Sequence, residues 1–200
     1  MKNIFRGERL PEFTRLLLYA PTFRDHGETK VFPFPEFEGA GREAALKRLQ
    51  EFLEKHQSML CIRMHLYEKE GYEWLRALDH PGSRIRFLNE DRVKDIMEVL
   101  AMFDLLITDY SSIYIDYLLL ERPMLFLPYD REDYLKTRGF NFDYDEVTPG
   151  PKPKSYAEFL NSIEGLLYNE MNYVENRKKI ERKFNKIQEP CSEYICRMVK

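Results

Sequence analysis

Five short apolar runs alternate with segments of helical periodicity along the chain. The runs are apolar at consecutive positions rather than at every second one, which is typical of strands buried on both faces of a parallel sheet. They occupy residues 16–20, 59–63, 85–88, 105–108 and 124–127. Between the first two runs, residues 42–56 place their apolar side chains on one face, which predicts an amphipathic helix.

Shorter helical patterns fill other gaps, at residues 72–78, 93–103 and 112–120. Strands that alternate with helices predict an α/β domain with a Rossmann-like, doubly wound parallel sheet and right-handed crossovers. In such a sheet, ligands bind beyond the carboxyl ends of the strands. The segments that we expect at that edge are residues 21–25, 64–67, 89–92, 109–112 and 128–130.

The chain after the fifth run divides into a loop and two helical regions. Residues 129–154 read as one long polar and aromatic loop, and loops of this length are usually functional. Ser155 and Glu158 form a capping box that predicts a helix through Leu167. The tail from Glu170 is also helical in its pattern and is rich in Lys and Arg.

Length and composition are those of one globular domain, residues 1–200. The chain is 44% hydrophobic and 32% charged, and its formal net charge of -3 gives no support for nucleic-acid binding. No apolar run approaches the roughly 20 residues that span a bilayer, and the N-terminal residues lack the apolar core of a signal peptide. Three cysteines, without the spacing of a disulfide framework or a zinc site, favour a cytoplasmic location.

Aromatic residues are abundant, with 14 Phe and 13 Tyr. Many fall in predicted loops, and Phe32, Phe34 and Phe37 are an example. Packing of these loops onto the domain is the simpler interpretation, and a surface that receives a partner is the alternative.

The segment DLLITDYSSIYID, residues 104–116, is the most informative part of the sequence. A buried strand passes into a helix there, so free backbone N–H groups lie beside the hydroxyls of Ser111 and Ser112, and such a place suits a phosphate. Ordinary N-capping is the other interpretation, and for this segment alone it is the more common one. Asp109 would repel an anion, so we expect it to orient backbone N–H groups or cap the helix.

Four segments at these strand ends resemble the CDP-glycerol glycerophosphotransferases that polymerise teichoic-acid-like chains. The first two are YAPTFRD at residues 19–25 and the histidine that follows the second apolar run, His65. The others are DLLITDYSSIYIDYLLLERPMLF at residues 104–126 and YDREDYLKTRGFNFDYDEVTPGP at residues 129–151. The histidine stands in the context Met64-His65-Leu66, where the family usually has Leu-His-Pro.

The resemblance implies a GT-B fold, in which two Rossmann-like domains face each other across a cleft. The chain looks like the C-terminal, nucleotide-binding half of that fold, without the N-terminal acceptor-binding half. The implied reaction is attack of an acceptor hydroxyl on the glycerol-bearing phosphorus of CDP-glycerol, with CMP leaving. The implied acceptor is a polyol phosphate or glycan of the cell surface, the implied location is the cytoplasmic face of the membrane, and no cofactor is expected.

The resemblance also assigns roles to particular residues. His65 would be the general base on the acceptor hydroxyl, or would hold the departing phosphate as an imidazolium. Arg24, from the family's APT-x-R motif, would make a forked contact with the diphosphate. The residues expected to bind the diphosphate and the nucleotide are Arg24, Thr108, Asp109, Ser111, Ser112, Arg138 and Gly139.

Two further motifs have competing interpretations. Asp143-Tyr144-Asp145 spells the DxD of metal-dependent sugar transferases, but a chain with 34 acidic residues produces such a triplet readily, so we predict no metal site. The basic segment that carries Ile180, Phe184 and Ile187 on one side suits contact with anionic lipid or packing against another domain.

Three alternatives to the main function stay open at this level. A CDP-ribitol transferase would use the same CDP group on the donor. A GT-B glycosyltransferase would use a UDP-sugar, and a non-catalytic module would bind a nucleotide without transferring anything.

Overall fold

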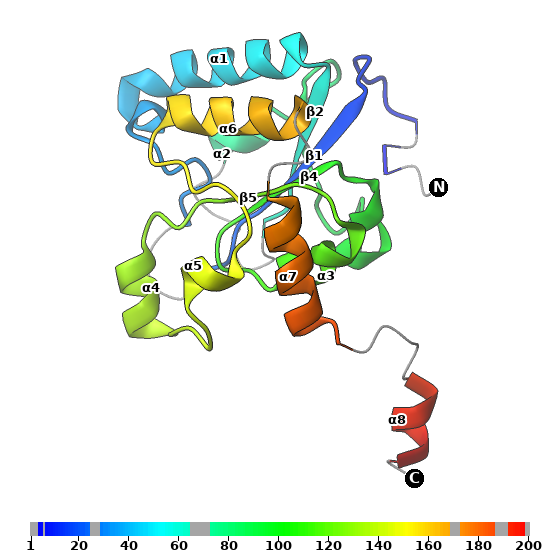
Figure 1. Cartoon of the computed structure of the whole chain (residues 1–200). Helices are drawn as coiled ribbons and strands as arrows, with labels where there is room; N and C mark the ends of the chain where they lie inside the picture. The colour runs from blue at the N-terminus through cyan, green and yellow to red at the C-terminus, as the bar shows by residue number, and fades with distance from the viewer. Residues whose placement is uncertain are drawn as a thin grey trace.

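The computed structural model describes residues 4–5, 7–24, 29–64, 73–168, 173–186 and 192–198. Its centre is a five-stranded parallel sheet of order β3-β2-β1-β4-β5 (Figure 1). The strands are β1 (Arg15–Ala20), β2 (Ser58–Ile62), β3 (Ile85–Phe87), β4 (Leu105–Thr108) and β5 (Met124–Phe126). Each predicted apolar run therefore forms a strand, with its bounds shifted by at most one residue.

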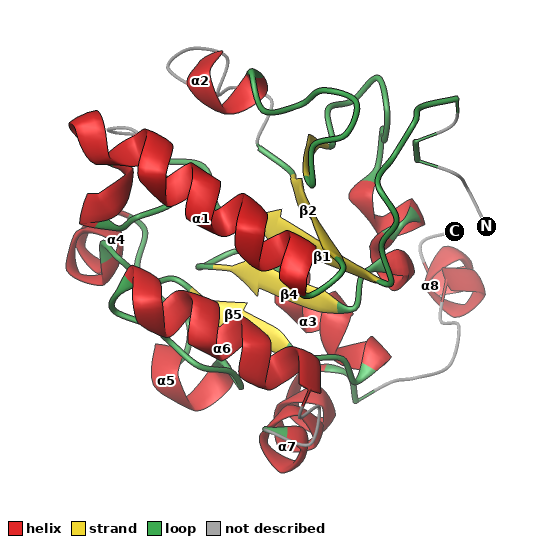
Figure 2. Ribbon diagram, turned by 90° about the horizontal axis from the view of Figure 1, so that it is seen from above, coloured by secondary structure: helices red, strands yellow, loops and turns green. Residues whose placement is uncertain are grey.

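Both faces of the sheet are covered, which explains why the strands are apolar at consecutive positions. Leu17 and Tyr19 of β1 face a core formed with α1 (Arg42–Lys55), α2 (Glu73–Arg76) and α6 (Tyr156–Tyr168) (Figure 2). Leu16 and Leu18 face a second core, to which α3 (Ile113–Tyr117), α5 (Tyr144–Val147) and α7 (Val174–Phe184) contribute. The predicted doubly wound α/β class is confirmed.

The segment before β4 differs from the prediction of one helix at residues 93–103. It forms two 3₁₀ turns, η3 (Ile96–Glu98) and η4 (Leu100–Met102). The Asp95 carboxylate accepts a hydrogen bond from Met97 N–H at the start of the first turn. Val99, with φ -124° and ψ 0°, lies between the two turns and interrupts the helical conformation of the backbone. The predicted helical tail forms two helices, α7 and α8 (Ser192–Met198).

The long loop predicted at residues 129–154 contains two short helices, α4 (Arg131–Thr137) and α5. Asp143 stabilises the start of α5, because its carboxylate accepts hydrogen bonds from Asp145 N–H and Glu146 N–H. The end of the loop runs beside the edge strand β5, where Phe126 N–H donates to Pro151 C=O at 3.0 Å. The prolines of this segment lack N–H groups. The segment therefore covers the edge of the sheet at β5 without forming a new edge to which another strand could bind.

Two smaller sequence predictions are confirmed. Phe32, Phe34 and Phe37 are buried in the core beneath α1 and α6, so loop packing accounts for them. Ser155 Oγ accepts a hydrogen bond from Glu158 N–H at the start of α6, while Glu158 Oε2 accepts one from Lys154 N–H.

The apolar side chains of helix α7 pack against other residues of the domain. Ile180 is buried, and the Phe184 ring packs edge-on against Tyr114 and Phe142. Ile187, the third residue of the predicted apolar side, lies outside the described residues. Among the helices that the structure describes, none has the length and apolar character needed to cross a bilayer.

Gly150 provides a test of the contact at the β5 edge. A Cβ atom there would overlap the Met124 carbonyl oxygen and lie 3.1 Å from the Phe126 ring, so we expect Gly150→Ala to destabilise the fold by about 1–3 kcal/mol. Gly165, inside α6, has open space around its Cβ position, and Gly165→Ala should stabilise by up to about 1 kcal/mol. Urea denaturation measures both. A Gly150→Ala protein as stable as the parent would contradict this edge packing.

Candidate functional site

The candidate site lies where the strand order reverses. From β1, the chain adds β2 and β3 on one side of the sheet and later β4 and β5 on the other. The carboxyl ends of β1 and β4 are neighbours, and the two loops that leave them diverge at this point. Ligands of doubly wound sheets bind at such a switch point. Thr22 and Asp109, from two of the segments predicted at this edge, meet here.

Asp109 joins the two loops. Its Oδ1 accepts hydrogen bonds from Thr22 N–H at 2.8 Å, Thr22 Oγ1 at 2.7 Å and Tyr110 N–H at 2.6 Å. Its Oδ2 accepts one from Arg24 Nη2 at 2.9 Å, and the residue is 1% exposed. Asp109 therefore orients backbone N–H groups, as expected from the sequence, and protein donors occupy both of its oxygens.

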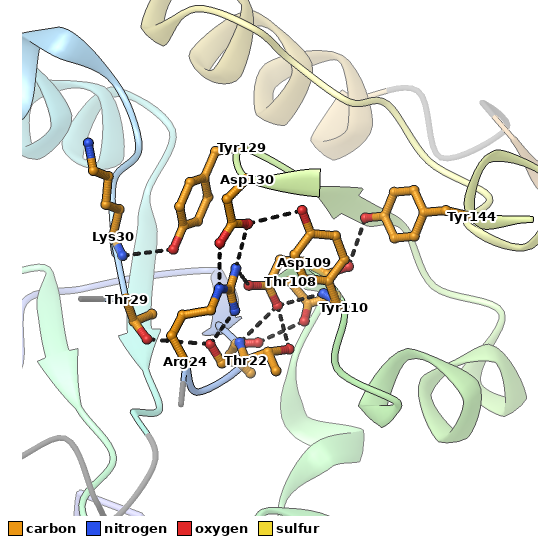
Figure 3. Close-up of polar contacts among 11 residues, drawn as sticks. Thr22, Arg24, Thr29, Lys30, Thr108, Asp109, Tyr110, Tyr129, Asp130 and Tyr144 are labelled. Atoms are coloured by element: carbon orange, nitrogen blue, oxygen red, sulfur yellow. Dashed lines mark hydrogen bonds and ion pairs between the residues drawn. The ribbon is translucent and has the colours of Figure 1, made fainter. Parts of the chain in front are cut away.

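Arg24 connects the same cluster to the loop after β5 (Figure 3). Its Nε and Nη2 form a fork on the Asp130 carboxylate at 2.6 and 2.9 Å, and Nη1 donates to Thr22 C=O at 2.6 Å. Burial alone would lower the pKa of Arg24, but the hydrogen bond to Asp130 and the charge of Asp109 outweigh it and raise the pKa. The forked contact assigned to a diphosphate is made with Asp130 in this structure, and contact with the diphosphate stays a prediction.

Three tyrosine rings surround the Arg24 guanidinium. Its Cζ lies 5.1 Å from the ring centres of Tyr110 and Tyr129 and 5.4 Å from that of Tyr134, within the range of cation–π attraction. The Tyr110 hydroxyl donates to Asp130 at 3.0 Å, and the Tyr129 hydroxyl accepts from Lys30 N–H at 2.9 Å. Burial, the largest cause, raises the pKa of Tyr129 to about 12, so both hydroxyls stay protonated at neutral pH.

The two serines after Asp109 do little to cap the helix that follows. Ser112 is the N-cap residue of α3, but its side chain makes no capping hydrogen bond and it is exposed. Ser111 Oγ accepts only a long hydrogen bond, 3.4 Å, from Ile113 N–H. Thr108 differs from both, because it is buried and its hydroxyl donates to Ala20 C=O at 2.7 Å. Its predicted contact with the diphosphate stays a prediction.

The Arg-Gly-Phe turn at residues 138–140 ends α4 and lies against the loop after β4. Gly139 has φ +73°, a conformation that ends helices and favours glycine, and its N–H donates to Tyr134 C=O. The turn places Phe140 with its ring centre 5.4 Å from that of Tyr110. Gly139 and Ser112 line one cavity of about 250 Å³ with several aromatic rings. Arg138 is exposed, and His65 lies outside the described residues.

Comparison with known proteins identifies the family. The sequence model of the CDP-Glycerol:Poly(glycerophosphate) glycerophosphotransferase family matches residues 2–200. The chain belongs to this family.

Curated relatives are named as teichoic acid glycerol-phosphate or ribitol-phosphate primases and polymerases. The chain is 38% identical over 143 residues to a teichoic acid glycerol-phosphate primase of Bacillus spizizenii, a match that covers 71% of this chain and 33% of the relative. It is 31% identical over 197 residues to a teichoic acid poly(glycerol phosphate) polymerase of Bacillus subtilis, covering 89% and 24%. It is also 30% identical over 155 residues to the ribitol-phosphate polymerase TarK of Staphylococcus aureus, covering 77% and 28%.

Solved structures of the wall teichoic acid polymerase TagF have the same fold. One superposes with a TM-score of 0.69 and 28% identity over 98% of this chain and 45% of the TagF chain. The chain therefore spans less than half of TagF and a quarter to a third of the curated relatives named above.

The glycerophosphotransferase family motif after β5 also contains the DxD triplet, whose two carboxylates have protein partners. Asp143 starts α5, as described above, and Asp145 forms ion pairs with Arg131 at 2.6 Å and Lys152 at 3.5 Å. The hydrogen bond from Arg131 is the main cause that lowers the pKa of Asp145. Within the described ranges, no group of three or more potential ligand side chains could hold a metal ion. The absence of a metal requirement stays a prediction.

Sequence reasoning missed several residues that build this site. Thr22 and Asp130 lie in segments predicted at the carboxyl edge, but nothing in the sequence pairs either of them with Asp109 or Arg24. Tyr110 stands between Asp109 and Ser111 in the segment of residues 104–116, where the two serine hydroxyls are the stronger signal for phosphate binding. Tyr144, whose hydroxyl donates to Asp109 C=O at 2.8 Å, stands 35 positions from its partner.

Arg24→Ala tests whether this cluster holds the loops together. The substitution leaves Asp109 and Asp130 without their cation in a largely buried place, so we expect a loss of about 3–5 kcal/mol in the free energy of unfolding. Arg131→Ala, which breaks the exposed pair with Asp145, should cost about 0–1 kcal/mol. Equal and small losses in urea denaturation would show that the Arg24 cluster contributes no more than a surface ion pair.

Proposed function

We propose that the chain supplies the donor site of a glycerophosphotransferase, which moves glycerol phosphate from CDP-glycerol to a hydroxyl of a teichoic-acid-like or other cell-surface polymer. The observation that carries the proposal is the Asp109–Ser112 turn at the switch point of the sheet. Protein donors occupy the Asp109 carboxylate, while the Ser112 hydroxyl is exposed and does not cap α3. Membership of the family supports the reaction class, and a TagF structure similar to this chain was soaked with CDPG.

The proposed chemistry is a phosphoryl transfer. An acceptor oxygen forms a bond to the glycerol-bearing phosphorus while the bond to the bridging oxygen of the diphosphate breaks, and CMP leaves. Catalysis of this kind depends on positioning and on stabilising charge more than on covalent intermediates. Ser111 and Ser112 would donate hydrogen bonds to phosphate oxygens. His65 would take the acceptor proton, and the proposal assigns no metal or cofactor.

The proposed cellular setting is the cytoplasmic face of the membrane, where a growing surface polymer meets a cytoplasmic donor. In α7, Lys179, Arg182 and Lys183 are exposed, while Ile180 is buried in the core. Contact with a membrane through this helix would therefore rest on attraction between lysines or arginines and anionic lipid rather than on inserted apolar side chains.

Isothermal titration of the 200-residue chain tests the donor. We expect binding of CDP-glycerol and CMP, and much weaker binding of UDP-glucose. CDP-ribitol belongs in the same series, because TarK and other relatives are named as ribitol-phosphate polymerases. A preference for CDP-ribitol would change the polyol assigned to the donor, and a preference for UDP-glucose would overturn the proposal.

The two serines are tested by Ser111→Ala and Ser112→Ala, alone and together. A hydrogen bond from a hydroxyl to a charged group is worth about 1.5–3 kcal/mol, so each substitution should weaken CDP-glycerol binding roughly tenfold to a hundredfold. The thermal melt should change little, since neither hydroxyl caps α3 strongly. Ser58→Ala is the control: its buried hydroxyl donates to His56 C=O, so it should lower the melting temperature without changing affinity. Stability loss without affinity loss in the Ser111 and Ser112 variants would return them to a capping role.

A further inference from the structure

The loop after β3, residues 88–94, lies at the same edge of the sheet as the candidate site. Leu88 N–H donates to Ile62 C=O, and Arg63 N–H donates to Tyr19 C=O, so both extend the ladders of the parallel sheet beyond the assigned strands. Arg63 is therefore level with Ala20 of β1, whose partner in β4 is Thr108. One strand separates Arg63 from Thr108, which places their backbones about 10 Å apart.

The Arg63 side chain fixes this loop. Nη1 donates to Leu88 C=O at 2.7 Å and to Val93 C=O at 2.8 Å, and Nη2 donates to Lys94 C=O at 3.2 Å. Leu88 and Val93 are themselves buried in the core on that face. One guanidinium thus gathers three carbonyl groups from both ends of the loop, and a lysine ammonium could not span them in this planar arrangement.

Arg63 and Arg24 differ in the kind of acceptor that their guanidinium groups contact. Arg24 is bonded to two carboxylates, whereas the three acceptors of Arg63 are neutral carbonyls. Burial lowers the pKa of Arg63, and Glu90 and Asp95 oppose this only through space. Two of its five N–H groups have no acceptor in the part of the chain that the structure describes. A partly buried arginine is normally matched by an anion, and the proposed ligand of this edge is one.

We propose that Arg63 is a positioning residue of the donor site, which fixes loop 88–94 at the carboxyl edge and keeps there a cation that no described carboxylate contacts. The anionic part of a nucleoside diphosphate ester is the ligand that this charge suits. This inference rests on the proposed function. The guanidinium of Arg24, by contrast, acts with Asp109 and Asp130 in a cluster that is negative overall, and so offers an anion little net attraction.

The experiment compares Arg63→Lys and Arg63→Gln with Arg122→Gln. Arg122 is a matched control, because its Nη1 also donates to two carbonyls, Ala101 and Phe103, but just before β4 at the opposite edge of the sheet. We expect both Arg63 variants to raise the Kd for CDP-glycerol roughly tenfold to a hundredfold, the range expected when a hydrogen bond to a charged group is lost. Hydrogen exchange of the amides in residues 85–95 should become faster in both. Arg122→Gln should leave the affinity and the exchange of that segment as in the parent.

Any one of three outcomes would overturn the inference. Parental affinity in Arg63→Gln would exclude Arg63 from the donor site. Parental affinity in Arg63→Lys alone would mean that charge suffices and that the clamp on three carbonyls does not matter. Unchanged exchange in residues 85–95 would show that Arg63 does not hold the loop. A parent protein that fails to bind CDP-glycerol would instead reject the proposed function, and the exchange comparison would still decide whether Arg63 positions the loop.

Discussion

The carboxyl edge of the sheet depends on one buried cation. Arg24 is 8% exposed and lies between the carboxylates of Asp109 and Asp130, in a cage of tyrosine rings. Removing these three charges from water is costly, and only good geometry with further hydrogen bonds offsets that cost. The structure supplies both, because Asp109 also binds Thr22 and Tyr110, and Asp130 also binds the Tyr110 hydroxyl. The loops after β1, β4 and β5 are consequently held in one arrangement.

This arrangement is compatible with the proposed binding of a phosphate by Ser111 and Ser112. A carboxylate in a phosphate site is a liability as long as it is free. Here protein donors occupy Asp109, so it acts as a fixed anchor for backbone N–H groups rather than as a competing charge. In this turn Asp109 accepts four hydrogen bonds from protein donors, and Ser112, three residues later, is exposed. Asp109, whose charge would repel an anion, thus holds the loops of the candidate site in place.

Local patterns in the sequence predicted the strands and the class of the fold well. They did not predict hydrogen bonds between side chains that are far apart in the sequence. Apolar runs of strand length gave all five strands, because burial on both faces leaves a signal in consecutive residues. The parallel sheet then placed the strand ends at one edge, which brought the segments of Thr22 and Asp109 together. The Arg24–Asp130 fork spans 106 positions, and no periodicity reports a contact of that kind. The sequence predicts Arg63 only as the last residue of the second strand, since nothing local shows that its side chain donates hydrogen bonds to carbonyls of the loop after β3.

The two arginines show how one edge can separate structure from binding. A guanidinium that is bonded to carboxylates gives strong, directional connections between the segments that carry them. A guanidinium that is held by carbonyls is equally well positioned and keeps most of its charge, because a carbonyl dipole cannot neutralise a full charge. The edge joins three loops and, as we propose, receives a diphosphate, and these two tasks suit the two kinds of guanidinium. Arg24 meets the first requirement at the centre of the site, and we propose that Arg63 meets the second, one strand away.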